Sequence, residues 1–264
     1  MESSENSLEN YWTQLPCDVM LMILMKVQHL QILVSVQFVC KSRHILCKEP
    51  SLWRTIQLKD NRKLRTVENF DDDFNILCNA VDSSAGDLID LDVECFVLHG
   101  LRSYVASRKL SSLEELDITL CDFVLPENIS IIKSCPSLTT FKLNELCWRD
   151  SDEACDKVAL AIAGRMHELR HLQLIANCMT NVGLMAILDG CPHLQSLDLR
   201  ACFHLDLDGH LGKRLSKQVK YLRRPYDSTE DYNYPTIDHY DSDFENGSDD
   251  FPYQDDFGRY YIIR

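Results

Sequence analysis

Two histidines and a glutamate in the middle of the chain have the spacing of a zinc-protease motif. His167-Glu168-Leu169-Arg170-His171 has the form H-E-x-x-H, which on a helix places two histidine ligands beside one zinc ion and the glutamate as general base. On a strand, at roughly 3.3 Å per residue, the same histidines stand about 13 Å apart and cannot share an ion. The motif therefore predicts metalloprotease chemistry only if this run is helical.

Other patterns that could support chemistry are missing from the sequence. It has no glycine-rich phosphate loop and no G-x-S-x-G elbow, and none of its 12 cysteines forms a C-x-x-C pair. The first ten residues lack the features of a secretory signal, so we expect reduced thiols and a nuclear or cytoplasmic location. We predict no enzymatic activity, no metal and no cofactor.

Charge and hydropathy narrow the classes of partner. The formal net charge of -14 disfavours nucleic acid, because a binder needs Lys and Arg to displace counterions from phosphates. The most apolar stretch, 19–39, is interrupted by polar residues such as Lys26 and His29, which disfavours a membrane span.

The leucines around the histidine motif belong to a repeat. The pattern L-x-x-L-x-L recurs, with first positions at Leu88, Leu113, Leu138, Leu169 and Leu194, which are 25, 25, 31 and 25 residues apart. Cys121, Asn177 and Cys202 follow three of these positions by eight residues, where leucine-rich repeats place Asn or Cys. The pattern predicts an α/β solenoid over 59–224, with parallel strands inside, near 88–93, 113–118, 138–143, 169–174 and 194–199, and helices outside. Trp53, Ile56 and Leu58 fit a further strand at its start. His167 and His171 then fall near a strand, which argues against the protease.

Residues between the buried leucines should face outward from the concave sheet. We take ten of them as candidate substrate-binding residues: Asp92, Glu94, Glu115, Asp117, Lys142, Asn144, His171, Gln173, Asp198 and Arg200. The surface is acidic in its first two repeats and mixed further on. It favours a basic partner segment there, or it is an ordinary solvated face.

Residues 11–58 have a different organisation. Leu15-Pro16-Cys17-Asp18 is typical of a helix start, and Val19, Ile23 and Val27 share one apolar face with their neighbours. Two more helices are predicted over 30–39 and 41–47. Such a short three-helix module buries little apolar surface, so we expect a partner to cover part of it.

Leu15-Pro16, Ile23-Leu24, Val39-Cys40-Lys41 and Leu52-Trp53 resemble an F-box. With the repeats, the chain is similar to plant-type F-box/leucine-rich-repeat proteins over about 11–220. The resemblance implies a non-catalytic adaptor of an SCF-type ubiquitin ligase. Its F-box would bind the Skp adaptor and through it a cullin, and its repeats would hold a protein substrate for ubiquitination and proteasomal degradation. It also implies the adaptor-binding residues Leu15, Pro16, Val19, Ile23, Leu24, Val39 and Cys40.

The sequence departs from the F-box pattern at Arg43, where the family usually has Trp. Loss of a buried aromatic costs about 3–5 kcal/mol when it is truncated to Ala. Two interpretations stand. Trp12 or Trp53 compensates, or the F-box is weakened and the chain is a leucine-rich-repeat scaffold no longer coupled to a ligase.

The last forty residues, 225–264, carry nine of the fourteen excess negative charges and alternate Asp with Tyr. They contain no Leu or Val, so we expect a disordered acidic tail. It either solubilises the protein or folds back on the basic stretch Lys213–Arg224 and regulates access to the repeats. The basic stretch itself is interpreted as a nuclear-import signal or as a solvated capping helix.

Overall fold

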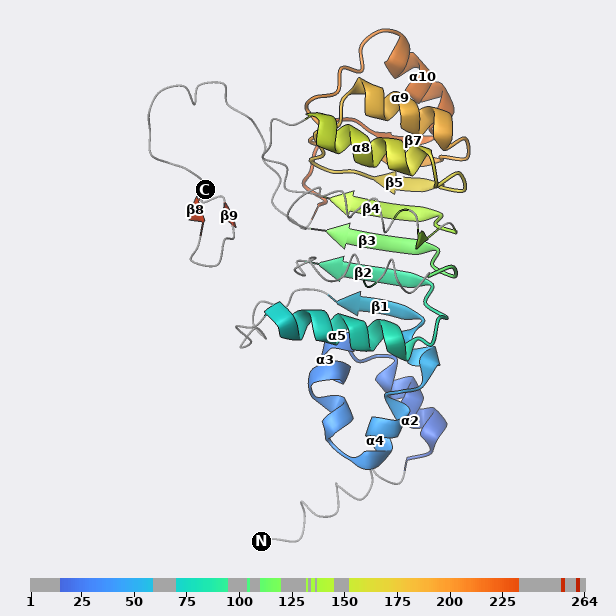
Figure 1. Cartoon of the computed structure of the whole chain (residues 1–264), viewed down its shortest axis with the longest axis vertical. Coiled ribbons are helices and arrows are strands. Elements are labelled where there is room, and N and C mark those ends of the chain that lie inside the picture. Colours follow the sequence, from blue (N-terminus) through green and yellow to red (C-terminus); the bar gives the residue numbers. More distant parts are fainter. Residues whose placement is uncertain are drawn as a thin grey trace.

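The structure is a computed structural model that describes residues 15–58, 70–94, 110–119, 137–144 and 152–232, together with 104, 132, 134–135, 253–254 and 260–261. A helical module stands at one end of an elongated molecule, and a stack of parallel strands extends away from it (Figure 1). One continuous hydrophobic core runs through both parts.

The N-terminal module consists of short helices, as expected. They are α2 (Cys17–Leu24), α3 (His29–Val34), the 3-10 helix η1 (Val36–Phe38), α4 (Lys41–Leu46) and the 3-10 helix η2 (Pro50–Trp53). Pro16 precedes the first helix and Asp18 lies in its first turn, where a carboxylate favours the positive end of the helix dipole. The single helix predicted over 30–39 is wrong, because the backbone breaks at Ser35 (φ -138°, ψ -57°).

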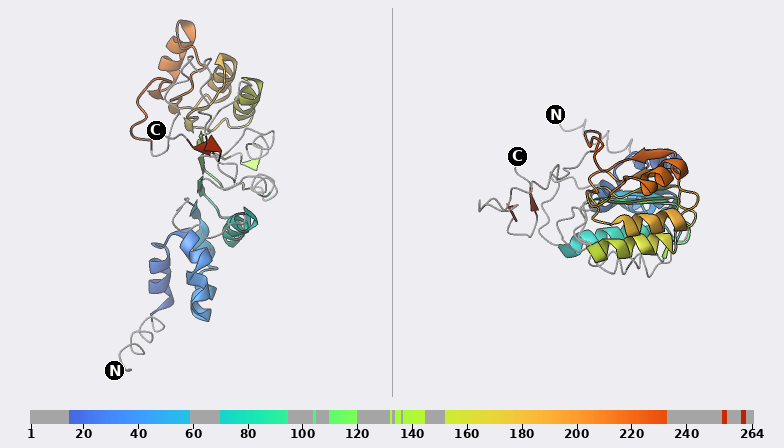
Figure 2. Two further views of the ribbon diagram at one scale, coloured as in Figure 1. Left: turned by 90° about the vertical axis from the view of Figure 1, so that its left-hand side faces the viewer. Right: turned by 90° about the horizontal axis from the view of Figure 1, so that it is seen from above.

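Seven parallel strands form one sheet in chain order, from β1 to β7. They are β1 (Thr55–Leu58), β2 (Asp90–Glu94), β3 (Glu115–Thr119), β4 (Thr140–Asn144), β5 (His171–Gln173), β6 (Ser196–Asp198) and β7 (Tyr221–Arg223). Helices α5 (Phe70–Ser83), α8 (Asp152–Ala163) and α9 (Asn181–Gly190) cover one face, and α10 (His210–Gln218) lies at the far end of the stack (Figure 2). Antiparallel β8 (Tyr253–Gln254) and β9 (Tyr260–Tyr261) pair separately.

The leucine rows lie inside the stack, as the repeat predicts. Leu91 pairs with Leu116, which pairs with Phe141, and the row continues through Leu172 and Leu197. All of these side chains are buried, and so is the first leucine of each of the five repeats. Each fully buried side chain contributes roughly 1.5–3 kcal/mol, so the stacked rows supply much of the stability of the solenoid.

The strands begin later than predicted. The first leucine of a repeat is buried but precedes its strand. Ile89 N and Asp90 N both donate to Arg54 O, and only then does regular pairing start at β2. The predicted pattern located the buried side chains correctly and placed the strand starts about two residues too early.

A seventh strand was missed. Val219 follows Leu194 by another 25 residues, and Leu222 pairs with Leu197, but Arg224 occupies the third apolar position. The basic stretch contributes to α10 and β7, which form a last repeat. The side chains of β7 are exposed or only partly buried.

The first eight residues of the predicted tail are ordered, and Asp231 pairs with Arg223 of the basic stretch, in line with the alternative of a tail that folds back on that stretch. Pro225–Tyr232 lies against the repeats, and Ala201 N donates to Pro225 O at 2.8 Å. Most of the remaining tail, including 233–252, lies outside the described residues.

Reduced thiols are found at seven described positions, but Cys178 is disulfide-bonded, contrary to expectation. Among the described helices, none alone has the length and apolar character to cross a bilayer. The required length and apolar character are met only when two helical segments, Cys17–Leu24 and His29–Phe38, are taken together, and a 120° bend separates these two segments.

Candidate protein-binding surfaces

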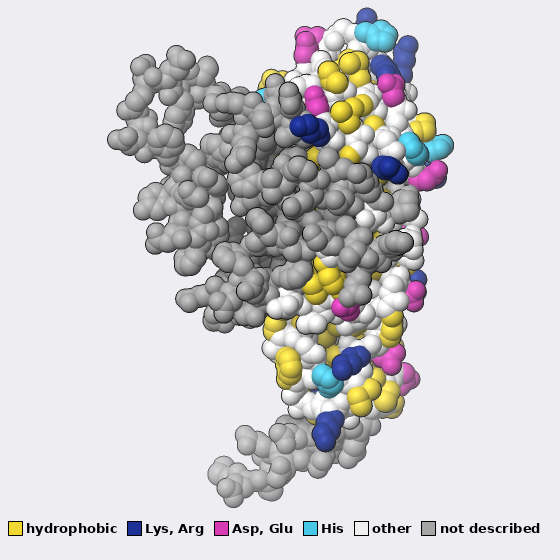
Figure 3. All heavy atoms as spheres, in the orientation of Figure 1, with side chains coloured by type: hydrophobic (Ala, Val, Ile, Leu, Met, Phe, Trp, Pro, Cys, Tyr) yellow, Lys and Arg dark blue, Asp and Glu magenta, His cyan; other side chains and the backbone are white. Residues whose placement is uncertain are grey.

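The helical module exposes apolar side chains that the repeats do not cover. Phe38 is 71% exposed and Val39 61%, and Ile45 on the neighbouring helix α4 is similarly open. Ile23 on α2 is also exposed, and Figure 3 shows hydrophobic side chains at the surface of this end of the molecule. We call Ile23, Phe38, Val39 and Ile45 the apolar F-box surface.

The predicted adaptor-binding residues divide into two groups. Pro16, Ile23 and Val39 are exposed, and Val19 and Cys40 are half-buried. Leu24 is only 2% exposed and belongs to the core, so its assignment as an adaptor contact is wrong. Leu15 is partly buried and packs against the same core. The sequence pattern could not separate the inner side of α2 from the outer side, because apolar residues occur on both.

Trp53 provides a buried aromatic for the module. It is 1% exposed, and its Nε1 donates to Cys47 O at 2.8 Å. Its ring lies 5.6 Å from that of His29, whose pKa is lowered by burial although a bond to Leu52 O opposes the shift. Arg43 lies half-exposed on α4, and Trp12 is outside the described residues.

The register of the sheet brings several predicted substrate-binding residues into one row. Asp92 pairs with Asp117, Asp117 with Lys142, Lys142 with Gln173, and Gln173 with Asp198. These five residues are all partly exposed, although the side chain of Asp198 is only 13% exposed. Glu115 and His171 are exposed in the adjacent row, while the side chain of Glu94 lies outside the described residues. A partner lying across the strands would meet these residues in that order.

The row begins acidic. Burial raises the pKa of Asp90 to about 6, with further contributions from Glu115 and Asp92. Lys142 Nζ donates to Asp117 Oδ2 at 2.9 Å. Burial lowers the pKa of Lys142, but its hydrogen bond and charge interaction with Asp117 outweigh burial and raise the pKa overall. Along the row of paired residues, the acidic part of the concave face therefore consists of Asp92 and Asp117 and ends at Lys142.

Asn144 is not a substrate contact, contrary to prediction. It is buried, its Nδ2 donates to Thr119 Oγ1 at 3.0 Å, and its Oδ1 accepts from Ile175 N at 3.0 Å. Asn177 and Cys202 serve the turns in a similar way: Asn177 Oδ1 accepts from Met179 N, and Cys202 Sγ donates to Leu174 O. A buried polar group that bonds the backbone stabilises the fold.

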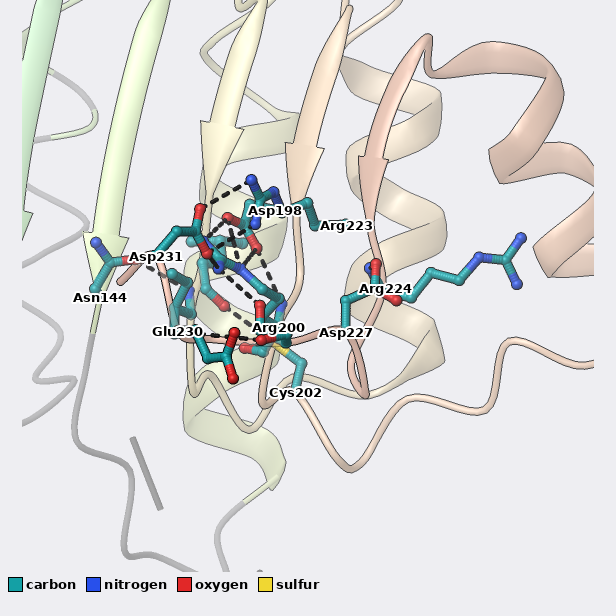
Figure 4. A network of polar contacts seen from close by, with 12 residues as sticks. Asn144, Asp198, Arg200, Cys202, Arg223, Arg224, Asp227, Glu230 and Asp231 are labelled. Carbon is teal, nitrogen blue, oxygen red and sulfur yellow. Dashed lines mark hydrogen bonds and ion pairs between the residues drawn. The ribbon is translucent and has the colours of Figure 1, made fainter. Parts of the chain in front are cut away.

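Arg200 is also not open to a partner. Its side chain is 5% exposed and holds Asp198 as a fork, with Nε to Oδ1 at 3.0 Å and Nη2 to Oδ2 at 2.8 Å. Nη1 donates to Asp231 and to Ser228 O (Figure 4). The predicted substrate-binding role for Arg200 is wrong, because the chain itself uses its donors.

The concave face is hollowed over β4 to β7, with a volume of about 460 Å³. We call this hollow the concave pocket. Its polar and aromatic lining includes Lys142, His171, Gln173, Asp198, Lys220, Tyr221 and Arg223. The last three lie in or beside the missed strand β7, and the 25-residue step to Val219 was the signal that could have found them.

The histidine motif does not form a helix. His167 lies in a turn, with Nδ1 2.8 Å from Gly190 O, and His171 begins β5. Within the part of the chain that the structure describes, no three His, Cys, Asp or Glu residues are grouped to hold a metal ion. The arrangement that an H-E-x-x-H protease requires is therefore not formed here.

A short helical module followed by stacked strand-helix repeats defines a class of interaction protein. An F-box-like family model matches residues 12–59. Relatives in Arabidopsis thaliana include F-box/LRR-repeat protein 21, 40% identical with 84% of each chain covered, and F-box protein SKIP19, 35% identical with 91% of this chain and 87% of the relative covered. F-box/LRR-repeat protein 9 of the same organism is 36% identical, over 80% of this chain and 96% of its own. The chain belongs to the F-box/LRR-repeat family, as its sequence pattern indicated.

Proposed function

We propose that this protein is the substrate-recognition subunit of an SCF-type ubiquitin ligase. The F-box binds the Skp adaptor, which docks on a cullin, and the repeats hold a protein for ubiquitination and degradation. The observation that carries the proposal is the apolar F-box surface, whose side chains are left exposed by the described part of the chain at the end of the molecule away from the repeats. Exposed apolar surface of this kind marks a site of association.

The chain needs no catalytic group for this role. An adaptor accelerates transfer by holding its substrate near a transferring enzyme, at an effective concentration on the order of mM. The partly exposed row from Asp92 to Gln173 offers polar contacts for the substrate, and the rigid leucine core fixes their spacing.

Replacing apolar side chains of the F-box surface should abolish adaptor binding. We expect Ile23→Asp with Val39→Asp to reduce co-purification with the Skp adaptor at least tenfold, because a buried unpaired charge opposes association. Both side chains are exposed in the free protein, so the melting temperature should change little. Affinity capture followed by quantification of the adaptor measures the effect.

Val182→Asp is the matched control. Val182 is a 58% exposed aliphatic residue on α9, far along the chain from the F-box, and its replacement should leave adaptor capture intact. Equal capture by the double variant and the wild-type protein would contradict the proposal.

A leucine-rich-repeat scaffold without ligase coupling is the second candidate, and Arg43 is the observation that favours it. If wild-type protein fails to capture the adaptor while Arg43→Trp captures it, the scaffold function holds instead.

A further inference from the structure

The segment Pro225–Tyr232, which we call the C-terminal strap, turns back over the carboxyl ends of the strands. Pro225 O accepts from Ala201 N beyond β6. Seven residues later, Tyr232 interacts with Thr119 at the end of β3, and Arg200 lies over its ring at 6.0 Å from the centroid. Burial is the main cause that raises the pKa of the Tyr232 phenol. The strap therefore crosses several strands of the concave face.

Asp231 anchors the strap to two arginines. It forms ion pairs with Arg200 and with Arg223, the latter at 2.9 Å (Figure 4). These arginines hold the pKa of Asp231 below its ordinary value, although desolvation acts in the opposite direction. The Asp231 side chain is 53% exposed, and that of Arg223 is 48% exposed. The ion pair between Arg223 and Asp231 is open to water and is therefore weak, so another carboxylate can replace Asp231 at Arg223. The Arg200 side chain, in contrast, is only 5% exposed.

Arg223 also lines the concave pocket, and the other charges of that pocket favour an anion. Lys220 lies 4.8 Å from the Tyr221 ring centroid. Lys142, on the β4 side of the lining, is already paired with Asp117 at 2.9 Å, so Arg223 and Lys220 are the cations that face an incoming anion. Asp198, the acidic residue of the lining, is already bound by the Arg200 fork. A carboxylate that enters the pocket would meet Arg223, and Asp231 is the acidic residue of the strap that already pairs with this arginine.

We propose that the concave pocket binds an acidic side chain of a partner protein, and that Asp231 of the strap competes for the same arginine, Arg223. The proposal deepens the proposed function by naming the class of substrate segment, one rich in Asp or Glu. It differs from the sequence-based expectation of a basic segment, which concerned the first two repeats. In the free protein Asp231 occupies Arg223, and a partner carboxylate gains this arginine by replacing Asp231 there, while the ion pair of Asp231 with Arg200 holds the strap in place.

The test uses the full chain and a fluorescein-labelled hexaglutamate peptide, with binding followed by fluorescence anisotropy at low salt. Asp231→Asn removes the internal competitor while keeping its size, and we expect about tenfold tighter binding than in the wild type. Adding Arg223→Gln to that variant should return the affinity to the wild-type level or below.

Asp227→Asn is the matched control. It removes the same charge four residues earlier, but Asp227 accepts from Arg224 N at 2.7 Å and contacts neither Arg200 nor Arg223 in the structure. Its effect should be less than twofold. The proposal is overturned if Asp227→Asn and Asp231→Asn tighten binding equally, which would reflect net charge alone, or if Asp231→Asn leaves binding unchanged or weakens it.

Adaptor capture by the same variants separates this inference from the proposed function. Asp231→Asn should capture the Skp adaptor as well as the wild type, because the strap and the F-box lie at different parts of the molecule. If the wild-type protein does not capture the Skp adaptor, the proposed ligase role is contradicted, but the measured effect of Asp231→Asn on peptide binding still supports the acidic-segment site.

Discussion

At the start of β2, Asp90 occupies a position that costs the folded protein stability at neutral pH. The register places it beside Glu115, and Asp92 lies on the same face of the strand. Asp117 adds to the repulsion, whereas Lys142 reduces it. Together with burial, these charges raise the pKa of Asp90 to about 6, so the folded state binds a proton more tightly than the unfolded chain does.

We therefore predict that Asp90→Asn stabilises the protein at pH 7. The contribution of Asp90 to stability is fully present below its unfolded pKa of about 4 and is lost as pH rises through about 6. Asn carries no charge, so the variant should be more stable by about 1 kcal/mol at pH 7 after allowing for solvent screening, and the gain should disappear near pH 4. Urea unfolding at both pH values measures it.

The exposed Asp87, in the turn before β2, is the control: Asp87→Asn should shift stability little at either pH. A gain for Asp90→Asn that is the same at pH 4 and pH 7 would show that ionisation is not its cause.

At the scale of elements, one carboxylate joins two neighbouring helices. Asp156 of α8 accepts from Thr180 N at 2.9 Å, from Thr180 Oγ1 at 2.6 Å and from Gly183 N at 3.1 Å. Thr180 in turn caps α9 by accepting from Val182 N. The helices can approach this closely because Gly183 has no side chain: a Cβ there would lie 2.4 Å from Asp156 Oδ1. The first turn of α9 therefore depends on α8.

We expect Asp156→Ala to destabilise the protein by about 2 kcal/mol, because it leaves donors at the start of α9 without their acceptor. Chemical denaturation measures the change. Asp189→Ala, which breaks an exposed ion pair to Arg214, should cost less than about 1 kcal/mol. Similar losses in both variants would argue against the role of Asp156 as a joint between helices.

At the scale of the whole molecule, the F-box and the repeats share a core through Trp53. Its indole N–H bonds the carbonyl of Cys47 at the end of α4, and Ile56 and Leu58 of β1 follow directly as buried residues. Each repeat of a solenoid contacts mainly its neighbours, so a junction residue of this kind couples the end module to the stack.

Trp53→Ala should cost about 3–5 kcal/mol and separate the unfolding of the F-box from that of the repeats. Calorimetry should show one transition for the wild type and two for the variant, the lower one belonging to the F-box. A single, merely shifted transition in Trp53→Ala would contradict the coupling.

The sequence by itself determined the repeat and the module before it. A 25-residue period of leucines cannot be satisfied by any unit alone, so the stack, its parallel strands and the buried row from Leu91 to Leu197 follow from spacing. Local apolar patterns predicted a short helical module, its resemblance to known families indicated an F-box, and the family comparisons confirm that resemblance.

Only the tertiary structure decided which of the polar and apolar candidates are free to bind. Leu24 and Ile23 are adjacent aliphatic residues on one helix, yet the packing of α2 buries the first and exposes the second. Arg200 and Asp231 are 31 residues apart, and no local pattern reports that they meet. Burial and long-range ion pairs depend on how segments fold over one another, whereas periodicity depends only on neighbours along the chain. The leucine rows could therefore be predicted from sequence. For the strap the sequence offered only the alternative of a tail that folds back on the basic stretch, and it could not name Arg200 and Arg223 as the partners of Asp231.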